Sequence, residues 1–113
     1  MSDAPAKLDL KSSTDVLRNA TKPFAVLLEH GDAMVELYSP RGKDAQGPHD
    51  RDELYVVASG GGLFRRGEDL IPFAAGDVLF VPAHMPHRFE SFSDDFRTWV
   101  IFFGPKGGSE ASG

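Results

Sequence analysis

Two stretches of the chain decide how it folds: GPHDRDELYVVASG at residues 47–60 and GDVLFVPAHMPH at residues 76–87. In the first stretch His49 and Glu53 stand four residues apart, so in an extended strand both side chains point to one face. Tyr55 shares that face and is the kind of residue that fills a barrel interior. A histidine and a carboxylate buried beside it are costly unless they pair or bind a metal.

The second stretch ends in a proline-rich turn, and a short strand is predicted to begin at His87. Alternation along this strand places His87, Phe89 and Ser91 on one face. Arg88 and Glu90 fall on the other face, and because this charged pair belongs in solvent, His87 points inward. Two imidazoles and one carboxylate inside a barrel suit Fe(II) and also take Mn, Ni, Co or Zn.

The remaining pattern is typical of an all-β protein of one domain. Short apolar segments alternate with turn residues, and 12 Gly and 8 Pro suit tight turns between strands. Strands are predicted at residues 24–28, 33–38, 54–58, 63–65, 70–73, 78–81, 88–92 and 97–103. Regular spacing with no helix between the strands predicts a sandwich or a closed barrel.

Outside the predicted barrel, the sequence indicates only a short helix. The expected parts are an N-terminal segment with a short helix at 1–23, a barrel at 24–103 and a flexible Gly/Ser-rich tail at 104–113. Residues 8–10 are assigned to a short strand. The Ser, Thr and Asp residues at 12–15 are candidate N-caps for one or two helical turns that reach about Ala20.

The predicted strand at residues 24–28 is apolar at every position. A strand with one solvated face would alternate, so both faces of this one are covered. Either the domain itself or a partner chain covers the second face, and we expect a homodimer.

Composition excludes several classes of protein. The net charge of −5 and the lack of basic clusters beyond Arg65 and Arg66 argue against binding to nucleic acid or anionic membranes. The absence of cysteine excludes disulfides and thiolate metal ligands. Residues 1–10 contain no apolar signal segment and no run of the chain could span a membrane, so we expect a cytoplasmic protein.

The two quoted stretches resemble the two motifs of the cupin family, and the resemblance covers about residues 34–103. The matching positions are His49, Glu53 and Gly60 in the first motif and Gly76, Pro82 and His87 in the second. The resemblance implies a cupin-type double-stranded β-helix, or jelly-roll barrel. It also implies that His49, Glu53 and His87 hold a metal ion.

The departures from the family pattern concern the fourth ligand. Gly47 occupies the place of the first histidine of the first motif. Gln46, His84 and Tyr55 are the candidates for a fourth ligand or for the pocket lining. Gln46 reaches inward only if the backbone after it is irregular. His84 lies in the turn, where exposure to solvent is favoured over a contact with substrate.

The resemblance implies a small metalloenzyme with one divalent transition metal (Fe, Mn, Zn or Ni), acting on a small molecule by dioxygenase-like or isomerase/lyase-like chemistry. The alternative is a non-catalytic small-molecule-binding or sensor cupin with a degenerate metal site. A buried hydrogen-bonded network without metal is the alternative for the same three residues, and a metal site is favoured over it.

For the remaining side chains, alternation along each strand predicts whether they point into the barrel or toward solvent. Glu36 stands between Val35 and Leu37, so its side chain is expected to face solvent rather than the metal. Asp50 and Asp52 are expected to face outward, which argues against a calcium site. The aromatic residues expected mostly in the core are Tyr55, Phe64, Phe80, Phe89, Trp99 and Phe103.

Overall fold

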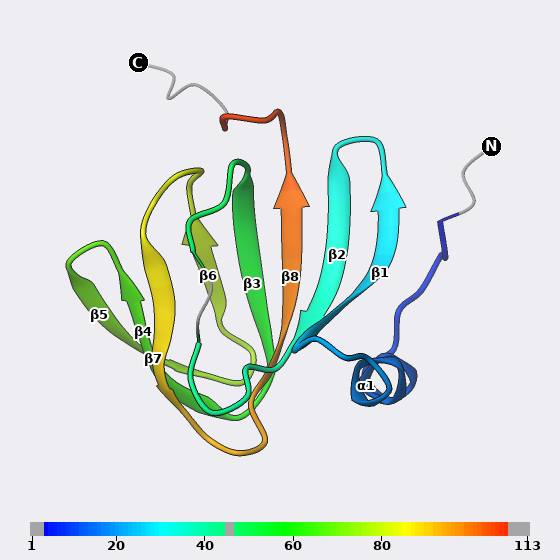
Figure 1. Cartoon of the computed structure of the whole chain (residues 1–113), viewed down its shortest axis with the longest axis horizontal. Helices are drawn as coiled ribbons and strands as arrows, with labels where there is room; N and C mark the ends of the chain where they lie inside the picture. The colour runs from blue at the N-terminus through cyan, green and yellow to red at the C-terminus, as the bar shows by residue number, and fades with distance from the viewer. Residues whose placement is uncertain (1–3, 45–46, 109–113) are drawn as a thin grey trace.

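A computed structural model describes residues 4–44 and 47–108 and shows one helix followed by antiparallel strands (Figure 1). The elements are α1 (Leu10–Arg18), β1 (Phe24–His30), β2 (Ala33–Tyr38), β3 (Asp52–Ser59), β4 (Gly61–Arg66), β5 (Asp69–Ala74), β6 (Val78–Val81), β7 (His87–Phe92) and β8 (Arg97–Phe103). The all-β barrel expected from the sequence, with a short N-terminal helix, is confirmed. Among the described residues, no helix has the length and apolar character needed to cross a membrane.

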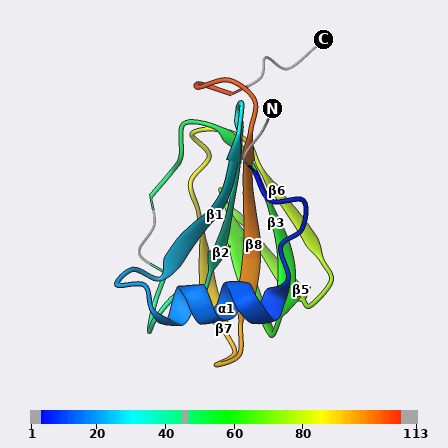
Figure 2. The ribbon, with the colours of Figure 1, turned by 90° about the vertical axis from the view of Figure 1, so that its right-hand side faces the viewer.

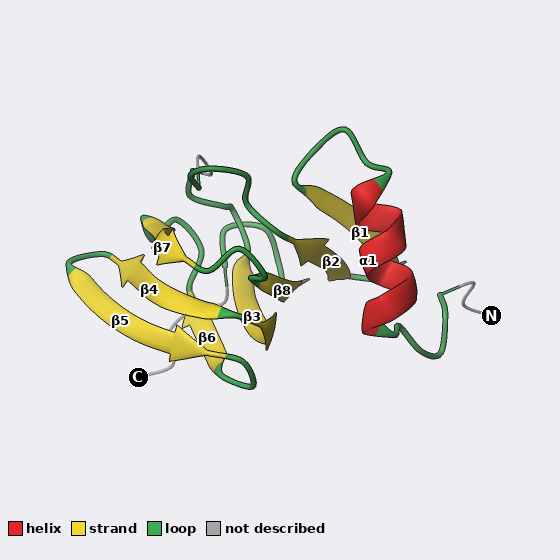
Figure 3. Ribbon diagram, turned by 90° about the horizontal axis from the view of Figure 1, so that it is seen from below, coloured by secondary structure: helices red, strands yellow, loops and turns green. Residues whose placement is uncertain are grey.

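The strands form two sheets, with the orders β1-β2-β8-β3-β6 and β5-β4-β7 (Figures 1 and 3). Their inner faces meet in a core rich in aromatic rings, because alternate residues of each strand point inward. The chain passes from β3 to β4 at Gly60, whose φ of +79° and close approach to the backbone of Phe96 leave no room for a side chain. This crossing puts β4 in the second sheet, where β7 pairs with it, so that residues of β3 and β7 can face each other.

The helix α1 begins earlier than the sequence pattern indicates. Asp9 is its N-cap and accepts a hydrogen bond from the backbone N–H of Ser12 at 2.9 Å, so the short strand predicted at residues 8–10 is wrong. Leu17 of the helix packs against Ala25 and Leu37, on one face of β1 and β2 (Figure 2). The helix therefore covers part of the apolar strand β1, so that no partner chain is needed there. Val26 of the same strand stays 45% exposed. The homodimer stays a prediction.

Among the side chains that face differently from the prediction are Phe80 and Ser91. Phe80 is 44% exposed, because Leu79 and Val81 are the inward-facing residues of β6. Ser91 is exposed and Phe92 packs against the core, since the register between β4 and β7 shifts by a bulge. A bulge reverses which residues face inward, so parity counted from His87 fails beyond it.

Candidate metal centre

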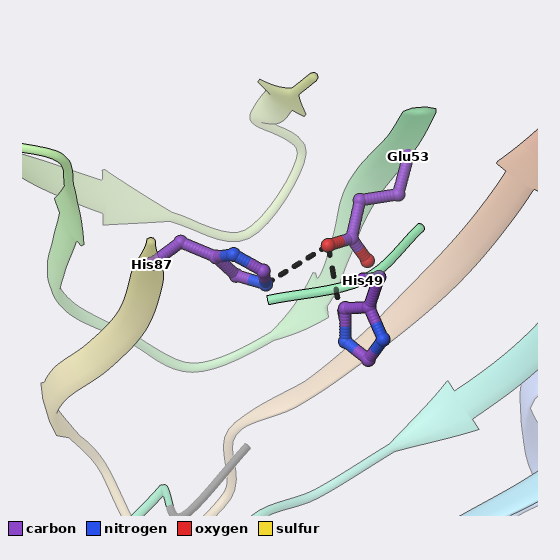
Figure 4. A group of neighbouring side chains, drawn as sticks. All are labelled: His49, Glu53 and His87. Atoms are coloured by element: carbon purple, nitrogen blue, oxygen red, sulfur yellow. Dashed lines mark ion pairs between the residues drawn. The ribbon is translucent and has the colours of Figure 1, made fainter. Parts of the chain in front are cut away.

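Three elements bring His49, Glu53 and His87 together inside the barrel (Figure 4). Glu53 lies on β3, His87 opens β7 in the opposite sheet, and His49 lies in the loop that leads into β3. One ligand atom from each of the three residues lies within 4.8 Å of the other two. Nε2 of His87 is 2.9 Å from Oε1 of Glu53, and Nε2 of His49 is 4.0 Å from the same oxygen.

Three buried polar atoms of this group lack hydrogen bonds in the part of the chain that the structure describes. Glu53 is fully buried and His87 is 6% exposed. Within the described residues, both carboxylate oxygens of Glu53 and Nε2 of His87 have no hydrogen-bond partner, and the short contact between the two side chains is an ion pair only when His87 is protonated. Buried polar atoms are nearly always satisfied, and an unpaired buried charge carries a large desolvation cost. A divalent cation between these atoms would satisfy all of them.

The ring of His87 is oriented for such a role. Its Nδ1 lies 2.8 Å from the backbone carbonyl oxygen of Met85, to which it donates, so the lone pair of the neutral ring is on Nε2. Burial by itself lowers the pKa of His87, but the neighbouring Glu53 and the Met85 carbonyl outweigh burial and the pKa is raised. Proton and metal therefore compete for the same Nε2.

His49 is held by its backbone and by ring packing. Its carbonyl oxygen accepts a hydrogen bond of 2.7 Å from the backbone N–H of His84. Its ring packs edge-on against Phe102, with 5.1 Å between ring centroids, and lies 5.4 Å from the ring of His87. It is only half-buried, so it forms the boundary between the buried pair and the space outside.

The structure describes two of the three secondary candidates, His84 and Tyr55. His84 is exposed, adopts a φ of +69°, and contributes to the site through its backbone. Tyr55 is fully buried and packs beside His87, with 6.1 Å between ring centroids, where it supports the ring. Gln46 lies outside the described residues. A Cβ added at Gly47 would meet no atom within 4 Å, so a side chain at the place of the usual first histidine would have open space around it.

The donor set fits a first-row divalent metal. Two imidazole nitrogens and one carboxylate oxygen are suitable ligands for Fe, Mn, Zn or Ni, and three protein ligands leave positions open for a small molecule. The contact of His87 with the Met85 carbonyl is also the kind that ligating histidines usually make through their second ring nitrogen.

A cavity of about 500 Å³ adjoins the group, with His49 in its wall. Glu36 lines the same cavity, so the expectation that it faces solvent is wrong. Alternation along β2 holds, but α1 covers the Leu37 side, which leaves the Glu36 side facing the barrel interior. Burial, and then the negative charge of Glu53, raise the pKa of Glu36 to about 7.

Two buried acidic residues are structural: Asp52, which alternation predicted to face outward, and Asp44, which no pattern singled out. Asp52 is buried rather than outward-facing, since its carboxylate accepts a hydrogen bond of 2.9 Å from the backbone N–H of Ala83. Asp44 is also buried, and it accepts hydrogen bonds from the Tyr38 hydroxyl at 2.5 Å and the Phe89 backbone N–H at 2.8 Å. No local pattern marks Asp44, because its partners lie on β2 and β7.

Comparison with known proteins now assigns the class. A family model described as the Cupin domain matches residues 34–102, more than half of the chain, and the chain belongs to the cupin family. The uncharacterized protein SCO3923 of Streptomyces coelicolor is 40% identical over 63 residues, which are 56% of this chain and 60% of that protein. The match thus spans less than two thirds of the relative's length.

Solved structures share the same architecture. A cupin-2 domain containing protein from Shewanella frigidimarina superposes with a TM-score of 0.66 at 17% identity, over 86% of this chain and 94% of that one. KdgF from Halomonas sp. superposes with a TM-score of 0.65 at 16% identity, over 78% of this chain and 86% of that one. At these identities the likeness concerns the fold alone.

Proposed function

We propose that this chain is a metal-dependent cupin that acts on a small molecule, with one divalent transition metal bound by His49, Glu53 and His87. The observation that carries this proposal is the convergence of the three ligand atoms within 4.8 Å, where Glu53 and His87 have buried atoms without hydrogen bonds. A metal ion suits such a group because it accepts lone pairs from both imidazoles and from the carboxylate at the same time.

The residues around the group define what the site could do. A bound divalent ion would supply Lewis-acid chemistry, or oxygen activation if it is iron. Glu36 faces the cavity beside His49 and titrates near neutral pH, so it is placed to give a proton to, or take one from, a molecule held there. Val100 and Phe24 line the same cavity and exclude water from part of the bound molecule.

A non-catalytic binding or sensor cupin is the second candidate, and the glycine at position 47 favours it. A fourth protein ligand is absent there, and a site that has lost a ligand can keep its pocket without the reaction. Binding of a small molecule by the metal-loaded protein without any turnover would favour this candidate.

The proposal is tested by metal analysis of single variants. We expect purified wild-type protein to carry about one equivalent of a first-row metal, and His49→Ala, Glu53→Gln and His87→Gln to lose most of it. His84→Ala is the matched control, since it removes an exposed imidazole from the adjoining turn and should keep the metal. Full metal content in His49→Ala would refute the assignment of that ligand.

A further inference from the structure

The cavity beside the candidate metal centre has two cations in its wall. Arg41 and Lys43 line it together with His49 and Glu36, and both cations are exposed whereas Tyr38 and Val100 in the same wall are buried. The exposed cations therefore lie at the mouth of the cavity and the buried side chains lie deeper. Such a local excess of positive charge contrasts with the net charge of −5 for the whole chain.

Arg41 and Lys43 form no ion pair within the described residues, although Arg41 also borders a second cavity whose wall contains Asp94 and Asp95. The segment that carries them contains Asp44, but its carboxylate is turned inward and bound by Tyr38 and the Phe89 backbone. Within the described residues, Lys43 forms no ion pair, and the one hydrogen bond of Arg41 is a long one of 3.4 Å to the carbonyl oxygen of Ala20.

Three other arginines of the protein are bound to side-chain partners. Arg65 and Arg88 both contact the carboxylate of Glu90, and Arg97 donates to the hydroxyls of Ser59 and Thr14. The guanidinium of Arg41 is thus available to a ligand in a way that these are not. An available guanidinium favours carboxylate and phosphate groups, which it can bind through two parallel hydrogen bonds.

We propose that this cavity binds a small organic anion, whose carboxylate or phosphate group is recognised by Arg41 and Lys43 while its other end lies toward His49. This inference deepens the proposed function and rests on it for the reacting end of the molecule. A volume of about 500 Å³ is within the usual range of small-molecule sites. Glu36 is the acidic residue of the described wall, so one acid stands there against the two cations Arg41 and Lys43.

The inference is tested by titrating the zinc-loaded full chain with malonate, with methyl phosphate and with uncharged malonamide. NMR or calorimetry measures the affinity for each compound. We expect at least one of the anions to bind, and malonamide to bind at least about tenfold more weakly. The variant R41Q/K43Q should lose at least about tenfold in anion affinity. The matched control K11Q/R88Q removes the same charge from exposed positions on α1 and the outer side of β7, and should stay within about twofold of wild type.

Two results would overturn the inference: malonamide binding as tightly as malonate, or R41Q/K43Q binding both anions as tightly as wild type. Preference for malonate or for methyl phosphate supports the inference and identifies the head group.

Metal content separates this inference from the proposed function. R41Q/K43Q should retain the metal of the wild type, and a wild type without metal would refute the proposed function. The anion titration of the metal-free chain would then still test the role of Arg41 and Lys43.

Discussion

The interior of this barrel has two regions that are built by opposite rules. In the first, Phe96 packs against Phe89, Phe73 and Phe92 with ring centroids 4.7, 5.0 and 5.7 Å apart, and the contacts are apolar. In the second, Glu53 is equally buried, but its carboxylate oxygens have no hydrogen-bond partner among the residues that the structure describes. The aromatic region gains stability from packing, whereas the polar region keeps buried groups unsatisfied, which is the usual mark of a site that awaits a ligand.

The greatest loss of stability is expected from a change in the aromatic region. Phe96→Ala should lower the free energy of unfolding by about 3–5 kcal/mol, because it deletes a ring that is 1% exposed and leaves a cavity among three others. Urea denaturation of the metal-free protein measures this change. Phe80→Ala is the control, since its ring is 44% exposed and its loss should cost less than about 1 kcal/mol. Similar losses in the two variants would contradict the assignment of the core.

The next effect concerns the polar region, where a metal should supply the stability that packing does not. Zinc or nickel at a free concentration of about 100 times its Kd should raise the free energy of unfolding by about 2.7 kcal/mol. Thermal unfolding with and without a chelator measures the increase. Glu53→Gln should abolish it and His84→Ala should preserve it. An undiminished increase in Glu53→Gln would place the metal elsewhere.

A smaller effect is expected at Glu36, the second buried carboxyl beside the polar region. Its pKa is 4.5 in the reference state and about 7 in the folded protein, so the folded state holds this proton more tightly. Stability from this group is complete below pH 4.5 and is lost as the pH rises to about 7. Glu36→Gln should therefore match wild type near pH 4.5 and, allowing for partial exposure, exceed it by about 1–2 kcal/mol at pH 8.

Urea denaturation of the metal-free proteins across this pH range tests the prediction. Val35→Thr is a control on the same strand, where an altered side chain without a titrating group should shift stability equally at both ends of the range. An equal shift for Glu36→Gln at pH 4.5 and pH 8 would mean that this carboxyl titrates normally.

The candidate metal group was largely predictable, and its surroundings were not. His49 and Glu53 come from one local stretch with a spacing of four, and strand alternation predicts that they share a face, although in the structure His49 lies in the loop before β3. His87 joins them because the second stretch enters its own strand at that residue. Asp44 could not be predicted, since its burial depends on Tyr38 and Phe89, which are distant from each other in sequence.

Local information was enough to establish the all-β class, the strands that alternate with turns, and the three residues that share an inner face. Those features depend on periodicity and on residue chemistry over a few positions. Which face of β2 is inside depends instead on long-range packing, because the contact of α1 with Leu37 turns Glu36 toward the cavity. Long-range packing also decides that Arg41 and Lys43 line the same cavity as His49. These two residues lie in a loop, and the position of a loop depends on contacts with distant parts of the chain.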